Sequence, residues 1–563
     1  MILTRLVEYA ERLDDRPPIG FARKPVRWLI QLDGSGHFLG MISTTGEGKS
    51  ADRGKVFLVP DVPGRTTGNN PSLLVGSAEY VLGIDIKDKP ERAATRHDLF
   101  IELLQECQQE TSDPFVRTVL RFLEGEHPKG LELPSDFNEA DSLSFQVEDR
   151  FPFEQAAVKK FWQQKASARA ESRAGEQKLR CLACGEERPP TIRHDIKVKG
   201  VPGGQASGVA LISANANAFE SYGLQKSLIA PVCGDCSKAY AEALNHLIGH
   251  RENSLRVGNL IYLFWTQQDS DFRPANFLSD PDPTEVKRLI ESVRKGRPGG
   301  QLDSDAFYAL SLSGSGGRAV VRSWIETTIP TVQKNLAQYF RAMEIISTQT
   351  NENAHWGLFP LAASLVQDAG KSLPPPIPKA IIRTAIEGIP APKWLLHNAV
   401  KRACAEHKVT APRAAVIKLV LNTQPGKENS TMSAQLDTTN TEPAYLCGRL
   451  LSLLEQIQQA SIPGAKATII DRYFGTASSA PASVFGVLLR GTQSHLAKLR
   501  KEKPGLHVYF QKQVEEVCSS LPSFPLVLTL EDQGLFSLGY YHQRAFRKNS
   551  NASDKSTQNQ SQN

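Results

Sequence analysis

The sequence predicts an α+β N-terminal region with an inserted cysteine-knuckle segment, followed by an all-α helical-bundle C-terminal domain. Three observations support this fold class. Short strand-like runs and turns concentrate in the first 318 residues, two CxxC pairs interrupt that region, and apolar residues recur at helical spacing beyond residue 319. The 563 residues exceed what one core accommodates. At roughly 150 residues per domain, three or four domains are expected.

The N-terminal region mixes strands and helices. Residues 26–32 and 37–42 flank an Asp-Gly-Ser-Gly turn, which predicts a β-hairpin. Residues 92–124 carry apolar residues at helical spacing and predict helix. Further strands are expected at 260–265 and 306–312, where apolar and aromatic residues form continuous runs.

The chain divides into successive segments on the basis of composition. Polar, Pro- and Gly-containing stretches indicate linkers, and a final stretch of Ser, Asn and Gln indicates disorder. The predicted segments are an α+β region over 1–318 with a knuckle insertion near 179–240, a basic helical segment over 319–421, a linker over 422–443, a helical bundle over 444–547 and a disordered tail over 548–563.

The chain shows neither a membrane-spanning nor a secretory pattern. No window approaches 18 consecutive apolar residues. Glu8 and Glu11 interrupt the N-terminal apolar residues, which fit an amphipathic helix and not a signal peptide. We therefore expect a cytoplasmic protein with no membrane partner.

Four of the eight cysteines form two CxxC pairs, Cys181 with Cys184 and Cys233 with Cys236. Each pair can hold one side of a tetrahedral ion through its thiolates, and the neighbouring glycines permit the tight turn. The 48 intervening residues exceed common zinc-ribbon spacing, so they fit an insertion between two knuckles. The spacing predicts a structural zinc site. The alternative is two unrelated thiol pairs.

Two patterns that suggest catalysis lack residues that their motifs require. Residues 43–50 resemble a phosphate-binding P-loop, but Ser43 stands where that motif needs glycine. The dipeptides at 97–98 and 194–195 pair His with Asp, without the further ligands that a metal nuclease needs. No nucleophile–base arrangement stands out, so we expect a protein that is not an enzyme.

Positive charge gathers in one window. The net charge of the whole chain is +6, and residues 379–418 alone carry eight basic and two acidic residues. Such a stripe is typical of a phosphate partner, although a solvated helix face is the alternative. The candidate DNA-backbone contacts in this window are Lys401, Arg402, Lys408 and Arg413.

Several collinear segments resemble the large subunit of the type I-C CRISPR Cascade surveillance complex. These segments are 78–83, 196–201, 212–215, 218–223, 230–232, 243–245, 442–450, 467–475 and 533–544. One departure is Gly76-Ser77, where members of that family often carry Asp-Asn. The second cysteine pair is also not general to the family, so the zinc prediction depends on spacing alone.

The resemblance implies a subunit that joins the crRNA-bound Cascade backbone and crRNA-end subunits. Such a subunit recognises the protospacer-adjacent motif on double-stranded DNA, helps to open the duplex and recruits the helicase-nuclease. The candidate motif-recognition residues are Arg65, Asn69, Asn70 and Ser77. The alternative function is a zinc-stabilised structural scaffold that binds RNA or protein without reading DNA.

The resemblance also concerns the C-terminal bundle. In type I-C systems the small subunit can be made by internal translation of the large-subunit message. Met432 lies in the predicted linker, and a start there would leave the segment 444–547 intact as a small-subunit-like product. Its candidate phosphate contacts are Arg490, Lys498, Arg500 and Lys501.

Overall fold

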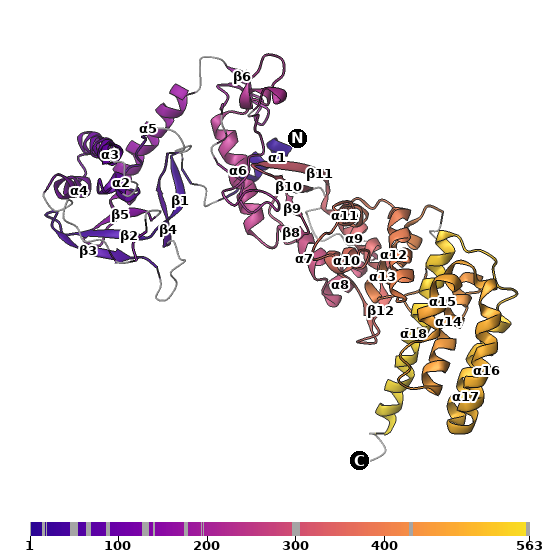
Figure 1. The fold of residues 1–563 in the computed structure, drawn as a ribbon. Coiled ribbons are helices and arrows are strands. Elements are labelled where there is room, and N and C mark those ends of the chain that lie inside the picture. Colours follow the sequence, from indigo (N-terminus) through magenta and orange to yellow (C-terminus); the bar gives the residue numbers. More distant parts are fainter. Residues whose placement is uncertain are drawn as a thin grey trace. The chain divides into compact units, whose positions relative to one another are not determined.

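The structure, a computed structural model, forms two compact units. Unit 1 comprises Met1–Val198 with Ala210–Asn245, and unit 2 comprises Lys199–Val209 with His246–Asn563 (Figure 1). The described residues are 2–13, 17–18, 20–45, 54–62, 69–85, 90–125, 134, 136–138, 141–173, 178–192, 194, 196–214, 216–294, 305–426 and 432–558.

Two small sheets lie in the N-terminal part of unit 1 among the described residues. The hairpin of β2 (Trp28–Leu32) and β3 (Phe38–Ser43) confirms the sequence prediction, and β5 (Leu143–Val147) joins β2 in parallel, giving the order β3-β2-β5. A second antiparallel pair consists of β1 (Phe21–Val26) and β4 (Lys55–Pro60). Trp28, Ile30 and Leu32 of the central strand are buried, which anchors the sheet in the core of this unit.

Helices α2 (Ala78–Val81), α3 (Pro90–Thr111), α4 (Pro114–Glu124) and α5 (Ala156–Arg173) pack in the same core as these sheets. The first helix, α1 (Ile2–Glu11), is not part of that core. The break between α3 and α4 has a local cause, because the Asp113 carboxylate accepts hydrogen bonds from the backbone N–H groups of Phe115 and Val116 and so caps α4. The helical prediction for 92–124 is confirmed, apart from this break.

The rest of unit 1 forms the knuckle region. Two short strands, β6 (Leu179–Arg180) and β7 (Glu187–Arg188), pair antiparallel. After two 3-10 turns, η3 (Asn217–Phe219) and η4 (Lys226–Ile229), the chain enters α6 (Gly234–Gly249).

Unit 2 begins with a four-stranded antiparallel sheet. Its strands are β8 (Ser254–Val257), β9 (Leu260–Thr266), β10 (Ala306–Ser315) and β11 (Arg318–Thr328), in the order β11-β10-β9-β8. The expectation of helix from residue 319 is wrong, and the boundary predicted at 318 falls inside the β10–β11 hairpin. Val320, Val321, Ile325 and two threonines give this stretch a β-branched composition that favours strand.

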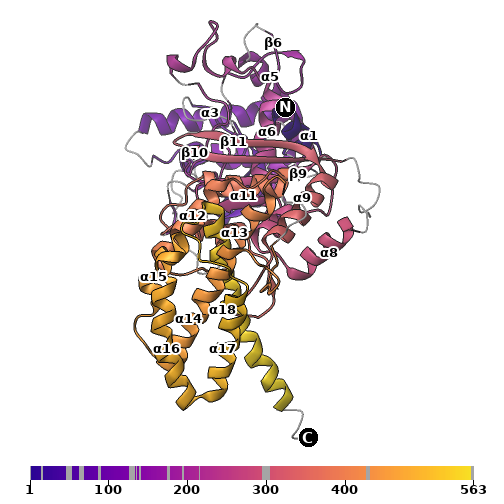
Figure 2. The same cartoon turned by 90° about the vertical axis from the view of Figure 1, so that its right-hand side faces the viewer.

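Helices make up most of the remainder of unit 2. They are α7 (Pro274–Ser279), α8 (Pro283–Arg294), α9 (Ile329–Met343), α10 (Leu358–Ala363), α11 (Pro376–Glu387), α12 (Lys393–Glu406), α13 (Ala411–Thr423), α14 (Pro443–Ser461), α15 (Ile469–Ser479), α16 (Phe485–Glu502), α17 (Pro504–Ser519) and α18 (Leu530–Gln558). A short pair of strands, β12 (Ile345–Ile346) and β13 (Asn353–Ala354), and one 3-10 turn, η6 (Pro481–Ser483), interrupt them. The helical C-terminal domain is therefore confirmed. In both ribbon views α14 and α18 lie side by side, with α16 and α17 next to them (Figure 2).

Glycines bring α14 and α18 into close contact. A β-carbon on Gly448 would lie 2.0 Å from the carbonyl oxygen of Phe536, and one on Gly539 would lie 2.1 Å from that of Tyr445. Because a side chain has no room at either position, the two backbones approach closely. These helices form the centre of the C-terminal bundle.

The bundle shares its core with the helices before it. Gly534 of α18 lies against Leu396, Ile417 and Leu421 of α12 and α13, and one cluster of buried residues extends from Leu255 to Ala545. The polar segment between α13 and α14 lacks regular structure in its described residues. The disorder predicted for the tail over 548–563 stays a prediction. No Gly or Pro follows Gly539, and α18 continues to Gln558, while residues 559–563 lie outside the described residues.

Among the described residues, no helix combines the length and apolar character needed to cross a membrane.

Candidate metal centre and nucleic-acid interface

Unit 1 brings the four predicted metal-binding cysteines together. The sulfur atoms of Cys181, Cys184, Cys233 and Cys236 all lie within 4.8 Å of one another. A tetrahedral ion with metal–sulfur distances of about 2.3 Å requires sulfur separations of roughly 3.8 Å, so the cluster is of the right size. Three of these thiols are buried, and Cys184 is exposed.

The first cysteine pair lies in a tight turn between β6 and β7. Cys181 N–H donates to the carbonyl oxygen of Glu186 at 2.9 Å, and Gly185 N–H donates back to the carbonyl oxygen of Cys181 at 2.9 Å. Gly185 has φ +78°, a left-handed conformation that glycine adopts without strain. The turn therefore directs both thiols to one side.

The second cysteine pair lies at the start of α6. Cys233 directly precedes the helix, and Cys236 lies in its first turn. The positive end of the helix dipole favours thiolate at this place. The Cys181 sulfur accepts two backbone hydrogen bonds at 3.4 Å, from the N–H groups of Ala183 and Cys233. These bonds join the two pairs and stabilise negative charge on that sulfur.

The thiols of the cluster differ in acidity. A hydrogen bond from the Cys236 side chain favours the charged form of Cys233 and lowers its pKa. The pKa of Cys236 rises because this thiol donates that hydrogen bond and faces the Cys233 charge. Partial desolvation of its sulfur raises the pKa of Cys184. Four thiolates cannot coexist here without a cation, whereas a bound divalent ion would displace the remaining protons.

The donor set indicates what such a site could do. Four sulfur ligands suit zinc and leave no open position for a substrate or water, so a metal here would hold the fold together. The cluster also connects to α1, because the Thr4 hydroxyl donates to the carbonyl oxygen of Ala183 at 3.1 Å.

The predicted motif-recognition residues lie near α2 and α3. Arg65 lies outside the described residues. Asn69 is exposed, Asn70 is half-buried, and Ser77 is the N-cap residue of α2, where its hydroxyl makes no capping hydrogen bond.

Arg96 of α3 links this segment to α2, and no spacing in the sequence pointed to it. Its Nε donates to the Asn69 side-chain oxygen at 3.2 Å, and its guanidinium pairs with the buried Glu79. The Arg96 Cζ also lies 5.0 Å from the centre of the Tyr80 ring. Arg96 therefore fixes the position of Asn69 relative to α2. Only the tertiary fold brings these residues together.

The basic window 379–418 separates into exposed and internal cations. Lys401 and Lys408 are exposed, whereas Arg402 is half-buried and forms an ion pair with Glu406. Arg413, a predicted DNA-backbone contact, lies inside the fold. Arg413 is only 2% exposed and donates to the carbonyl oxygens of Ser364 and Lys408, as well as to Glu406.

Lys418 is also internal. Its ammonium donates to the carbonyl oxygens of Arg341, at 3.1 Å, and Ala342, at 3.5 Å, at the end of α9. Arg413 and Lys418 are both internal because they lie on α13, which is buried around its whole circumference from residue 413 to residue 421. A cation on such a helix contacts protein carbonyls and carboxylates and not solvent.

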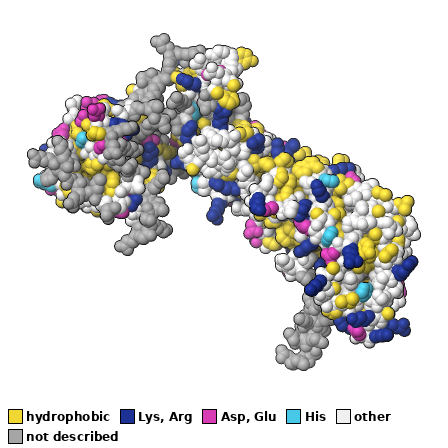
Figure 3. Space-filling view, in the orientation of Figure 1, with side chains coloured by type: hydrophobic (Ala, Val, Ile, Leu, Met, Phe, Trp, Pro, Cys, Tyr) yellow, Lys and Arg dark blue, Asp and Glu magenta, His cyan; other side chains and the backbone are white. Residues whose placement is uncertain are grey.

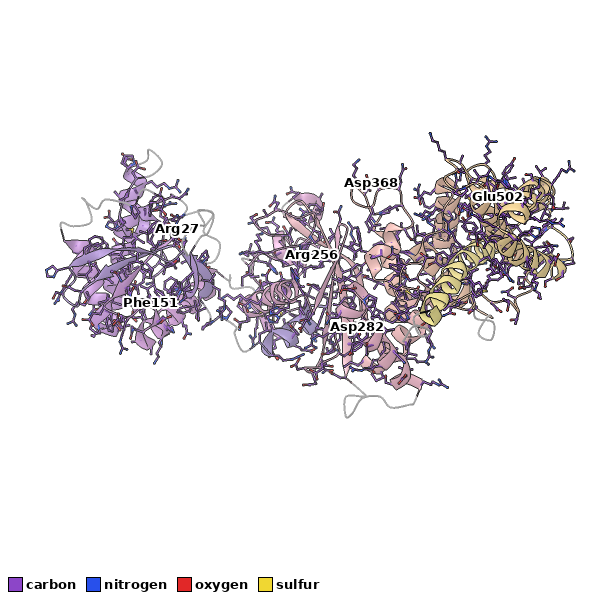
Figure 4. The ribbon with its side chains drawn as sticks, turned by 90° about the horizontal axis from the view of Figure 1, so that it is seen from below. Arg27, Phe151, Arg256, Asp282, Asp368 and Glu502 are labelled. Atoms are coloured by element: carbon purple, nitrogen blue, oxygen red, sulfur yellow. The ribbon has the colours of Figure 1, made fainter. Side chains whose placement is uncertain are left out.

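The four candidate contacts of the C-terminal bundle all lie on α16. Arg490, Lys498, Arg500 and Lys501 are exposed. Lys498 lies 4.0 Å from Glu502, a weak surface pair (Figure 4, where Glu502 is labelled). Figure 3 shows Lys and Arg side chains gathered at the end of the α16–α17 pair. These side chains are accessible to a phosphate group. Their contacts with the described residues do not distinguish one of them as a binding residue.

Comparison with known families gives one match. A family model described as a CRISPR-associated protein, Cas_Csd1, matches residues 6–547, which include parts of both units. No curated protein matches the chain.

Proposed function

The chain belongs to the CRISPR-associated Cas_Csd1 family, and from that membership we propose that it is the DNA-engaging large subunit of a type I-C Cascade. In this role it recognises the protospacer-adjacent motif, aids duplex opening and recruits the helicase-nuclease, with no catalytic step of its own. The observation that carries the proposal is the length of the family match, because it concerns the whole chain and not one module.

Unit 1 is the proposed place of motif recognition. Guide pairing reads the long target sequence, so the protein needs only a short recognition surface and contacts to the backbone. Asn69 and Asn70 carry amides that can pair with base edges, and Arg96 holds Asn69 in place.

The four cysteines have a structural part in this proposal. We assign them to one zinc ion, held by Cys181, Cys184, Cys233 and Cys236. The ion would link the turn between β6 and β7 to the start of α6, two elements far apart in sequence. It supplies folding free energy and no chemistry.

The C-terminal bundle is proposed to occur also as a separate small-subunit product that starts near Met432. A separate product would leave the face that Gly534 presents to α12 and α13 uncovered, because Leu396, Ile417 and Leu421 precede Met432. Such a product therefore needs a partner on that face. Intact-mass analysis of a complex expressed from the unaltered gene tests this, and a complex containing only the full-length chain contradicts it.

The main test is a DNA titration of the assembled ribonucleoprotein. Three targets are compared: a matched duplex with the correct motif, the same duplex with an altered motif, and a matched single strand. We expect the altered motif to weaken duplex binding at least tenfold and to leave single-strand binding unchanged. Equal affinity for both duplexes would favour the scaffold function, in which the chain binds RNA or protein without reading DNA.

A further inference from the structure

Helix α12 has one buried and one open face. Its buried residues are Leu395, Leu396, Ala399, Val400 and Ala403, which pack in the shared core of unit 2. The exposed residues Trp394, His397, Lys401 and Ala405 follow one another at spacings of three and four, which places them on a single stripe of the helix. This stripe, together with Lys408, is called the α12 face below.

Trp394 is an unusual residue for the solvent side of a helix. Its side chain is 40% exposed, while the residues that anchor the helix are the neighbouring leucines. The indole is therefore partly covered by the fold and partly open to solvent. An exposed aromatic plane of this kind offers a stacking surface.

Two cations extend the α12 face from this indole. Lys401 lies two turns along the helix, roughly 10 Å from Trp394 at 1.5 Å per residue. Lys408 follows His407, whose left-handed conformation ends the helix. Among the described residues, neither ammonium has a carboxylate within 4.0 Å in the ion pairs of this region.

The neighbouring charges are neutralised within the fold. Lys393 pairs with Glu531 at 2.6 Å, and Glu406 pairs with both Arg402 and Arg413. Arg383 pairs with Glu387. The charge that remains on this face is therefore positive, next to an exposed aromatic ring.

We propose that the α12 face binds a single-stranded nucleic acid, with one base stacked on Trp394 and the backbone phosphates on Lys401 and Lys408. A single strand fits because its bases are free to stack, whereas the base faces of a duplex are covered. A protein partner matched to this surface would need an acidic and apolar segment, and a planar ring with two exposed cations further along the same segment fits nucleotides better. This inference deepens the proposed function and rests on it, because the proposed Cascade complex is what would supply the single strand.

The test uses the purified full-length chain and two fluorescent twelve-nucleotide probes, oligo-dT and oligo-rU. Affinity is measured by anisotropy from 50 to 200 mM salt. Stacking is worth about 1–3 kcal/mol per base, so Trp394→Ala should weaken binding roughly five- to 150-fold, and Trp394→Phe should retain most of the affinity. Lys401→Ala and Lys408→Ala should each reduce the salt slope by about 0.7.

Phe359→Ala provides the matched control, because Phe359 is 48% exposed but lies on α10. Its affinity should equal that of the unaltered chain, and all variants should keep the same melting temperature. Equal affinity for both probes supports a site common to DNA and RNA. Tighter binding of one probe identifies whether the natural strand is DNA or RNA.

The proposal is overturned if the unaltered chain binds neither probe, or if Trp394→Ala binds as tightly as Phe359→Ala. It is also overturned if Trp394→Ala blocks assembly with other protein subunits while its probe affinity is unchanged, since the face is then a protein interface. Motif discrimination on duplex DNA is measured separately on the assembled complex. Loss of that discrimination in the presence of normal probe binding would contradict the proposed function and leave this inference standing.

Discussion

The cysteine cluster of unit 1 and the α12–α13 segment of unit 2 arrange their polar side chains in opposite ways. In unit 1, Cys184 and Cys233 are separated by 48 residues, and their sulfur atoms meet within 4.8 Å. In unit 2, Lys408 and Arg413 are five residues apart, and one faces solvent while the other is 2% exposed. Residues that are far apart in the sequence therefore come together in unit 1. In unit 2, residues that are close in the sequence have different surroundings.

The contrast teaches where polar groups stabilise a fold and where they are free for a partner. A group that converges with others, or is buried beside carbonyls, has partners in its own chain, and its loss leaves those partners unsatisfied. A group such as Lys401 is exposed and has no ion pair with the described residues, so its loss costs the fold little. Stability and binding measurements should therefore separate the two classes.

The largest effect is expected at the cysteine cluster. Cys233→Ser should abolish binding of about one zinc per chain and unfold residues 179–245 locally, because metal binding and folding are coupled at a four-thiolate site. Metal analysis and amide hydrogen exchange of the full chain measure both effects. Cys404→Ser, outside the cluster, should keep the metal. Freshly purified protein without zinc would contradict the assignment.

The next largest effect is expected at Arg413. Arg413→Ala leaves the carbonyl oxygens of Ser364 and Lys408 without this donor and removes one partner of Glu406, so unfolding should become easier by about 2–4 kcal/mol. Lys401→Ala, on the exposed face of α12, should change stability by no more than about 0.5 kcal/mol. Urea unfolding of both variants makes the comparison. Equal stabilities would show that burial does not separate these two cations.

Lys418 provides a pH test of the same distinction. Burial lowers its pKa to about 8 from an ordinary value of 10.5. The unfolded chain therefore binds more protons than the folded chain between these values, and stability rises with pH in this window. Below pH 8 the buried charge of Lys418 lowers the free energy of unfolding by its full amount. As the pH rises towards 10.5 the free energy of unfolding recovers by at most about 3 kcal/mol.

The variant that isolates this contribution is Lys418→Met, which cannot titrate. The difference in unfolding free energy between the unaltered chain and Lys418→Met should change between pH 8 and pH 10 in favour of the unaltered chain. Other Lys, Tyr and Cys residues titrate in the same range, and taking the difference removes their contribution. A constant difference across the window would mean that Lys418 keeps an ordinary pKa in the fold.

Local patterns predicted part of this molecule well. The β2–β3 hairpin and the cysteine cluster were predictable because a turn and a CxxC pair impose their geometry over a few residues. The orientation of α13 was not, since a helix carries charge in the same way whether it lies at the surface or is buried on all sides. Strand β11 was missed because its charged and polar residues obscure a β-branched pattern.

The site near α2 falls between these cases, and it gives the smallest effect. The sequence placed Asn69 and Asn70 on one short segment, but the hydrogen bond from Arg96 to Asn69 depends on the tertiary fold. Asn69→Ala should barely change stability, because Arg96 keeps its ion pair with the buried Glu79.

If either amide reads a base edge, replacing both asparagines with alanine should reduce motif discrimination by about 1–3 kcal/mol in the assembled complex and leave crRNA assembly intact. The control is Gln105→Ala, which removes an exposed amide from α3 that pairs with Glu124 at 2.9 Å. Because Arg96 orients Asn69, Arg96→Lys should reduce discrimination in the same direction while keeping the positive charge. Unchanged discrimination in the double variant would place motif recognition outside this segment.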